Sequence, residues 1–271
     1  MAVYFGLDGE MSAADVDAGG RLIQIGIAAQ NDMDGMPADI PAMFSSLINP
    51  GDMAWDARAA AVHGYTRDQI EQAPPAADVD QAVVDWLAGQ SVTDKRRNAI
   101  AVGYNVGSFD LPHVRLVLPR TAALFSRRTV DLNALCFTLE GLPYEGTAPG
   151  WSGWKRMAST YAERVIAGLP AGPDGFAAHD AGYDALLHLF AWRFLRAAAH
   201  GTPVTMPQTP VGGKDVKRAT GALLAAVGTD RAAALTGYAG PTLHGWANGG
   251  RVTDPNVLRI LTDVLAELAG G

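Results

Sequence analysis

Short apolar runs alternate with helical patterns in the first two hundred residues. The first two runs are rich in β-forming residues and are joined by a polar Asp/Gly segment, which resembles a hairpin. Strands are expected at residues 3–8, 21–28, 43–48, 99–104 and 129–131, and helices at residues 76–87, 111–125, 132–139 and 183–199. Strands that come first, with helices interleaved afterwards, indicate an α/β layer architecture with a mixed sheet.

A change of pattern divides the chain near residue 200. Residues 200–213 contain three prolines and three glycines without a helical or strand period, so they are expected to form a linker between residues 1–199 and residues 214–271. Beyond the linker the pattern predicts short helices at residues 215–227, 230–235, 241–247 and 256–268. A small all-α C-terminal domain is therefore expected.

Composition narrows the class of protein. The 271 residues are 48% hydrophobic and 18% charged, which excludes a disordered or collagen-like chain. No apolar run approaches the 18 or more residues of a membrane span, and an acid follows the first apolar residues at Asp8. These features predict a soluble, cytoplasmic protein with no membrane partner. The single cysteine, Cys136, is expected to be a small buried core residue.

The net charge of −7 argues against a protein that grips long nucleic acid through a broad basic surface. A nucleic-acid enzyme of such acidity would need bound cations at its active site. The basic runs at residues 95–97 and 127–128 are read as solvated surface, with phosphate contact as the alternative.

Several acids occupy positions from which they can meet. Asp8 and Glu10 end the first apolar run, and positions i and i+2 of a strand point to the same face. Asp110 follows the fourth strand, Asp184 lies at the start of the last helix of the domain, and His179 precedes Asp184 by five residues. Taken singly, each has an ordinary alternative: a solvated turn for the pair, a helix N-cap for the two later acids, and a cap or surface position for the histidine.

Together the segments resemble a known family. They read, in chain order, Asp8-x-Glu10, Asn105-x3-Phe109-Asp110 and His179-x4-Asp184. This set is similar to the three motifs of the DEDDh branch of the DnaQ-like 3′–5′ exonucleases, which have a ribonuclease H-like fold. The resemblance covers about residues 3–199. Residues 61–66 (AVHGYT) are similar to the family's Val-His-Gly-Ile-Thr stretch, and residues 179–185 to its His-Asp-Ala-x-x-Asp-Ala signature.

The resemblance implies roles for five residues. Asp8, Glu10, Asp110 and Asp184 would bind metal, and His179 would be the general base. Four carboxylates without thiols select hard cations, so two Mg²⁺ or Mn²⁺ ions are expected rather than Zn²⁺. Two such ions about 3.5–4 Å apart would clamp a phosphodiester, and the histidine would take the proton of the attacking water.

The second motif departs from the pattern. Asn105 lies five residues before Asp110, where many members have four, and the segment is closer to the exonuclease domains of family B DNA polymerases. Those domains end in a Tyr-x3-Asp motif. Here Asp180 stands at the tyrosine position, which favours the histidine branch. Met11 follows Glu10 as in oligoribonuclease-like members, where proofreading members usually carry Thr.

Candidate substrate contacts surround these motifs. Met11 and Phe109 are expected to pack against the terminal base or sugar, with core filling as the alternative. Ser12 and Asn105 are further candidates. His63 is expected either to hydrogen-bond the substrate strand or to fix a turn. The tryptophans at positions 151 and 154 are read as packing residues rather than a base platform.

The C-terminal segment resembles a phage-repressor-type helix-turn-helix. The resemblance rests on the spacing of Gly237, Trp246 and Gly249. It places near a recognition helix four residues that would meet base edges or phosphates, namely Thr242, His244, Asn248 and Arg251. Because basic residues are few here, a protein-docking or purely structural bundle is an equal alternative, so the expected partner is duplex DNA or a protein.

Two functions follow. The first is a two-metal 3′–5′ exonuclease that releases nucleoside 5′-monophosphates from the 3′ end of single-stranded DNA or RNA. The alternative is a nucleic-acid- or protein-binding regulatory module that uses the C-terminal helices, with the nuclease-like domain as a scaffold. The choice between DNA and RNA, and between proofreading and RNA turnover, stays open at this point.

Overall fold

The computed structural model describes residues 2–29, 41–92, 98–144, 146–168, 180–202, 204, 206 and 213–247, together with residues 260, 261, 264, 265 and 268. The chain forms two compact units, Met1–Pro207 and Gln208–Gly271. Within the described part, none of the helices combines the length and the apolar character that crossing a membrane requires.

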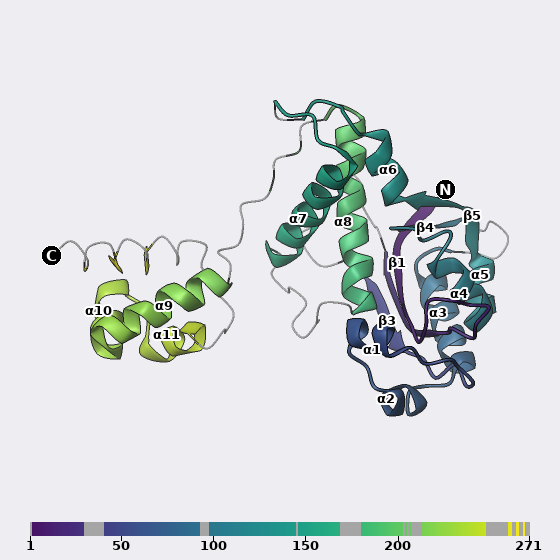
Figure 1. The fold of residues 1–271 in the computed structure, drawn as a ribbon, viewed down its shortest axis with the longest axis horizontal. Helices are drawn as coiled ribbons and strands as arrows, with labels where there is room; N and C mark the ends of the chain where they lie inside the picture. The colour runs from purple at the N-terminus through teal and green to yellow at the C-terminus, as the bar shows by residue number, and fades with distance from the viewer. Residues whose placement is uncertain are drawn as a thin grey trace. The chain divides into compact units, whose positions relative to one another are not determined.

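A five-stranded mixed sheet forms the centre of the first unit (Figure 1). Its order is β3-β2-β1-β4-β5, with bounds β1 Val3–Met11, β2 Leu22–Ala29, β3 Met43–Leu47, β4 Ala99–Gly103 and β5 Phe125–Asp131. The pairs β1–β2 and β2–β3 are antiparallel, whereas β1–β4 and β4–β5 are parallel. The expected α/β architecture with a mixed sheet is confirmed.

Alternation along β1 assigns its side chains to two different layers. Phe5, Leu7 and Met11 are buried in one hydrophobic core. Residues of α3 (Ala76–Gly89), α4 (Asp110–Val117) and α5 (Pro119–Leu124) complete this core. Gly6, Asp8 and Glu10 lie at the alternate positions, so they point to the opposite face of the sheet.

The opposite face is covered by α8 (Ala181–Ala199), against which α7 (Trp151–Gly168) and α6 (Leu132–Thr138) pack. Two glycines allow α8 to approach the strands closely. A Cβ atom at Gly6 would lie 1.9 Å from the carbonyl oxygen of Ala185, and one at Gly26 would lie 1.9 Å from that of Ala181. Gly26 is the cross-strand neighbour of Asp8, so the closest contact of helix and sheet lies beside this acid.

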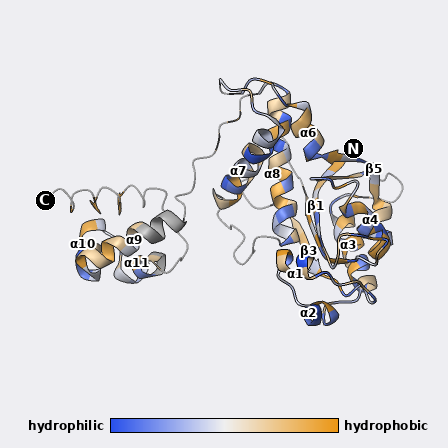
Figure 2. Ribbon diagram, in the orientation of Figure 1, coloured by the Kyte–Doolittle hydropathy of each residue, from blue (hydrophilic) through white to orange (hydrophobic). Residues whose placement is uncertain are grey.

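Two short helices follow β3, α1 (Ala57–His63) and α2 (Arg67–Glu71). The carboxylate of Asp56 caps the first, and Thr66 forms a capping box with Gln69 at the second. Gly64 joins them in the left-handed conformation at φ 77°. The helix α2 is largely hydrophilic (Figure 2), and only Ile70 is buried within it.

Several expected elements have different bounds. The helix predicted at residues 111–125 is interrupted at Leu118, because Pro119 cannot continue a helix and starts α5 instead. The strand predicted at residues 129–131 begins at Phe125, and its exposed Arg127 and Arg128 conceal the strand pattern. The helices α1, α2 and α7 were not predicted.

The second unit contains α9 (Gly213–Val227), α10 (Thr229–Thr236) and α11 (Gly240–Ala247). These bounds agree within two residues with three of the predicted helices. Its core consists of Leu223, Ala232, Leu243, Leu261 and Val264. Most of the predicted helix 256–268 lies outside the described residues.

Candidate active site

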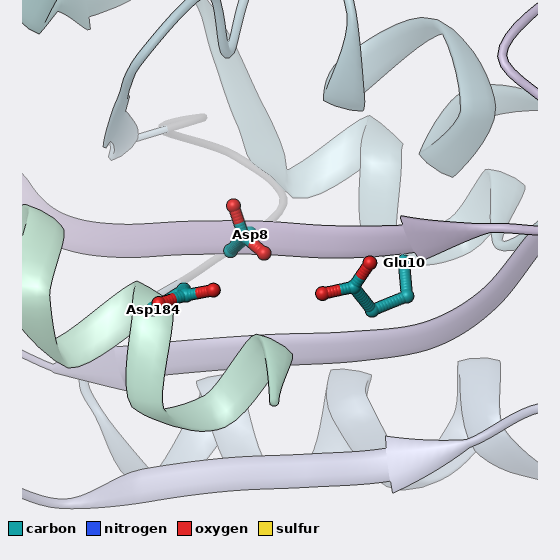
Figure 3. A group of neighbouring side chains, drawn as sticks. All are labelled: Asp8, Glu10 and Asp184. Carbon is teal, nitrogen blue, oxygen red and sulfur yellow. The ribbon is translucent and has the colours of Figure 1, made fainter. Parts of the chain in front are cut away.

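Three carboxylates from two elements converge on the α8 side of the sheet (Figure 3). Asp8 and Glu10 extend from β1, and Asp184 from the first turn of α8. One carboxylate oxygen from each lies within 4.8 Å of the other two. The strand period places the first two acids on one face, and the helix that crosses this face supplies the third.

Asp110 lies beside this group. It is the first residue of α4 and is only 3% exposed, and its Oδ1 accepts a hydrogen bond from the Gly9 N–H at 3.1 Å. Neither Asp110 nor Asp184 is the N-cap of its helix, because these positions belong to Phe109 and Asp180. The capping alternative for the two acids is therefore wrong.

Asp110 accepts its hydrogen bond from an edge of β1 that does not pair with β4. The pairing of β1 with β4 ends at Gly6 and Val102, and within the described residues no strand pairs with the next residues of β1 on this edge. The Gly9 N–H is satisfied by Asp110, and the Leu7 carbonyl accepts a hydrogen bond from Nδ1 of His188 at 3.0 Å. Side chains thus satisfy these two main-chain groups.

His188 is a site residue that the sequence analysis missed. Since a carbonyl oxygen only accepts, Nδ1 carries the proton, and Nε2 then faces Oδ1 of Asp8 at 3.9 Å. Burial lowers the pKa of His188 to about 4, so the ring is neutral near pH 7. A histidine on the buried face of α8, four residues after Asp184, is the sequence signal for it.

Burial raises the pKa values of the clustered acids. Burial raises the pKa of Glu10 to about 8, with a further contribution from the charge of Asp184. Burial raises the pKa of Asp110 to about 7, and burial together with the charge of Asp110 raises the pKa of Asp8 well above its usual value. At neutral pH the cluster holds either protons or a compensating cation. Its oxygen-only donors fit a hard divalent ion such as Mg²⁺ or Mn²⁺.

Gln24 and Asp180 fix the start of α8, a structural role that was predicted for neither residue. Oδ1 of Asp180 accepts hydrogen bonds from the N–H groups of Gly182 and Tyr183, and its Oδ2 accepts one from Nε2 of Gln24 at 2.9 Å. Oε1 of Gln24 accepts one from the Ala181 N–H at 3.1 Å. This amide therefore joins β2 to the helix that carries Asp184. A buried glutamine in an otherwise apolar strand is its sequence signal.

The expected general base, His179, lies outside the described residues. So do Asn248 and Arg251 of the C-terminal segment. Thr242 and His244 are described and exposed, and Nε2 of His244 lies 2.9 Å from Oγ1 of Thr229.

Two candidate substrate contacts belong to the protein interior. Met11 is 5% exposed and forms part of the core between the sheet and α3, which is the core-filling alternative. Ser12 is fully buried, and its Oγ accepts a hydrogen bond from the Arg21 N–H at 3.1 Å. Neither side chain lies on an accessible surface.

Phe109 and Asn105 lie near Asp110. Phe109 is 40% exposed and packs against the ring of His113 with 5.5 Å between the ring centroids. Asn105 adopts the left-handed conformation at φ 57°, and its Oδ1 accepts a hydrogen bond from Nδ2 of Asn133 at 2.9 Å. Both side chains are exposed, so a ligand can reach either of these two candidate contacts.

His63 is mostly buried and fixes a turn. Its Nδ1 accepts a hydrogen bond from the Tyr65 N–H at 3.0 Å, and its ring stacks on Tyr65 and meets the edge of Trp55. Trp154 is buried in the core, as expected for a packing residue, whereas Trp151 is exposed and stacks on Phe137. Cys136 is buried, which confirms its predicted core position.

Comparison with known proteins places the fold. No family model and no curated protein matches the chain. Among solved structures, E. coli Exonuclease I in complex with a dA16 oligonucleotide is similar, with a TM-score of 0.51 and 15% identity over 73% of this chain. The nuclease domain of 3′hExo, a DEDDh family member bound to rAMP, has a TM-score of 0.50 and 13% identity over 76% of this chain.

The two neighbours differ in how much of their length is matched. This chain spans 41% of Exonuclease I but 96% of the 3′hExo nuclease domain. The mixed five-stranded sheet with its flanking helices is therefore the ribonuclease H-like fold of these exonucleases.

Proposed function

We propose that this chain is a metal-dependent 3′–5′ exonuclease that hydrolyses the terminal phosphodiester bond of single-stranded DNA or RNA. The carrying observation is the convergence of Asp8, Glu10 and Asp184, with Asp110 beside them, on a fold that exonucleases use. The products would be nucleoside 5′-monophosphates.

The residues of the site divide into three roles. The four carboxylates would hold two divalent cations, Mg²⁺ or Mn²⁺. Bound there, such ions supply Lewis acidity to the attacking water and to the departing 3′ oxygen. His179 would accept the proton of the attacking water, a role suited to the usual pKa of histidine, about 6.5. His188 stays neutral beside Asp8 and donates its Nδ1–H to the Leu7 carbonyl.

A single-stranded substrate is supported by the oligonucleotide bound to one structural neighbour and by an exposed aromatic side chain of this chain. Exonuclease I was solved with a dA16 oligonucleotide, and 3′hExo with rAMP, so both sugars are kept in the proposal. The exposed ring of Phe109, next to Asp110, is suited to contact with a base or sugar, because stacking tolerates any base. The side chain of Asn105 is proposed to contact the same nucleic-acid strand.

A gel time course tests the proposal. The full chain is incubated with 3′- or 5′-labelled single-stranded DNA and RNA in Mg²⁺, Mn²⁺ or EDTA. We expect shortening from the 3′ end that requires the metal and falls by about 10²-fold or more in Asp184→Asn and His179→Ala. Asp52→Asn, which changes an exposed acid outside the site, is the matched control.

Two results would contradict the exonuclease. One is inertness on both polymers, which would favour the alternative of a binding module that uses its C-terminal helices. The other is an Asp184→Asn variant as active as the wild type, which would place the chemistry elsewhere.

A further inference from the structure

A pocket of about 440 Å³ lies between α4, α5 and the first residues of β5. Arg115 and Arg127 line it together with Ser126, and its apolar lining includes Ala122 and Ala123 above the buried Leu111 and Phe125. Among the residues that the structure describes, no acid lines this pocket. Its polar chemistry is therefore that of two guanidinium groups and one hydroxyl.

The pocket is separate from the candidate active site. Phe125, at the start of β5, pairs with Ala99 at the start of β4, which in turn pairs with Val3. The three strands run parallel, and Asp8 lies five residues further along β1. At about 3.3 Å per residue, the pocket and the carboxylates are at opposite ends of the strands.

The two arginines are not committed to other charges. Both are exposed, and in the part of the chain that the structure describes neither forms an ion pair, unlike Arg58 and Arg67. A guanidinium presents a planar fork of donors that matches phosphate oxygens.

Protection of the sheet edge does not explain the arrangement fully. β5 is an edge strand, and charged residues such as Arg127 discourage pairing with other chains. Arg115, however, lies on α4 and lines the same pocket. The volume also exceeds the needs of an inorganic ion and lies within the range of small organic ligands, about 300–1,000 Å³.

We propose that this pocket binds the phosphate group of a nucleotide. Arg115 and Arg127 contact the phosphate oxygens, and the sugar or base packs on the accessible apolar lining, where Ala123 is exposed and Ala122 is half-buried. Oγ of Ser126 accepts a hydrogen bond from the Arg128 N–H at 3.0 Å, which leaves its own proton for a phosphate oxygen. The choice of a nucleotide among organic phosphates rests on the proposed function, whereas the recognition of an anion does not.

Calorimetric titration of the full chain in EDTA at low ionic strength tests the pocket without hydrolysis. The ligands are dAMP, deoxyadenosine and inorganic phosphate. We expect dAMP to bind more tightly than phosphate, and deoxyadenosine to give no measurable binding. Each of Arg115→Gln and Arg127→Gln should weaken dAMP binding about tenfold, because a charge-assisted contact is lost. Arg156→Gln, which changes an exposed arginine of α7 outside the pocket, should not.

A second titration identifies the source of the phosphate. A fluorescently labelled 12-mer of single-stranded DNA is bound to the wild type and to the double variant R115Q/R127Q in EDTA. Loss of dAMP affinity alone assigns the pocket to free nucleotides, and loss of 12-mer affinity assigns it to phosphates within the strand. Binding of both ligands to the double variant as tightly as to the wild type would overturn the proposal.

The pocket and the exonuclease can fail separately. A chain that degrades no polymer but binds dAMP through both arginines refutes only the exonuclease. A chain that degrades single strands while the double variant retains wild-type affinities refutes only the pocket.

Discussion

Asp8 lies beside a histidine that stays uncharged near neutral pH. Nε2 of His188 is 3.9 Å from Oδ1 of Asp8, while its Nδ1–H donates to the carbonyl oxygen of Leu7 at 3.0 Å. Because burial lowers the pKa of this histidine to about 4, the pair is not an ion pair at pH 7. The ring therefore adds no positive charge that would repel a cation from the acids.

The first prediction concerns this histidine. His188→Leu should destabilise the protein by about 1–3 kcal/mol, because the Leu7 carbonyl loses its buried donor. His188→Gln keeps a donor and should retain more of that stability. Thermal unfolding measures this difference, and calorimetry measures whether the Mg²⁺ affinity of the neighbouring acids changes as well. Equal Mg²⁺ affinity in His188→Leu and wild type would show that this histidine contributes to stability alone.

The second prediction is a pH dependence of stability without metal. The pKa of Glu10 is about 8 and that of Asp110 about 7, both above their usual values. The folded protein thus binds these protons more tightly than the unfolded chain, so their contribution is fully present below pH about 4 and is lost as pH rises through 7 to 8. Melting temperatures in EDTA should fall between pH 6 and pH 8.5.

Glu10→Gln removes one of the buried carboxyls that cause this pH dependence. The variant should melt at a higher temperature than the wild type at pH 8.5 in EDTA, with a smaller decrease from pH 6. Asp52→Asn should follow the wild-type curve. A Glu10→Gln curve parallel to that of the wild type would show that the burial of this carboxyl is not what makes the metal-free fold sensitive to pH.

The third prediction is stabilisation by divalent cations. Mg²⁺ or Mn²⁺ at one hundred times its Kd should stabilise the fold by about 2.7 kcal/mol per site, because it binds only the folded acids. For a domain of this size that corresponds to a rise in Tm of roughly 5–10 °C. The rise should be larger at pH 8 than at pH 6, since protons compete for the same oxygens.

Asp184→Asn provides the test of the metal assignment. It removes one of the three converging carboxylates, so most of the Mg²⁺-dependent rise in Tm should disappear. Differential scanning fluorimetry in EDTA and in Mg²⁺ measures the rise. A full rise in this variant would mean that the cation binds elsewhere.

The fourth prediction concerns the contact between α8 and the sheet. A methyl group at Gly26 would overlap the carbonyl oxygen of Ala181, so Gly26→Ala must displace the helix. We expect a loss of about 1–3 kcal/mol in stability, together with weaker Mg²⁺ binding because Asp184 moves with the helix. Gly89→Ala, at the exposed end of α3, meets no atom within 4 Å and should be neutral or stabilising by up to about 1 kcal/mol. Urea unfolding distinguishes the two variants.

Local periodicity explains which parts of the site were visible in the sequence. The i, i+2 spacing of Asp8 and Glu10 places both on one strand face, and the structure brings Asp184 to them. The contacts of Gln24 with Asp180 and of His188 with Leu7 span 156 and 181 residues, so no local pattern reports them. The sequence signal for these two contacts was a polar residue inside an otherwise apolar strand or helix.

The strands and helices of the fold also differed in how well the sequence pattern predicted them. The strands β2 to β4 were predicted to within one residue, whereas β1 extends three residues beyond the predicted 3–8, through Glu10 to Met11. β5 was underestimated, because an edge strand tolerates the exposed Arg127 and Arg128. The helix α7 was overlooked although Trp154, Ala158 and Tyr161 form a buried stripe at helical spacing.

The unpaired edge of β1 affects the choice of inactive variants for trapping experiments. Removing the Asp110 carboxylate would remove a proposed metal ligand. It would also leave the Gly9 N–H without its acceptor, and an unpaired strand edge can pair with another chain. A loss of activity in such a variant could then not be separated from a loss of solubility. Glu10→Gln and Asp184→Asn leave that main-chain donor covered. Substrate-trapping complexes are therefore better prepared with one of these two variants.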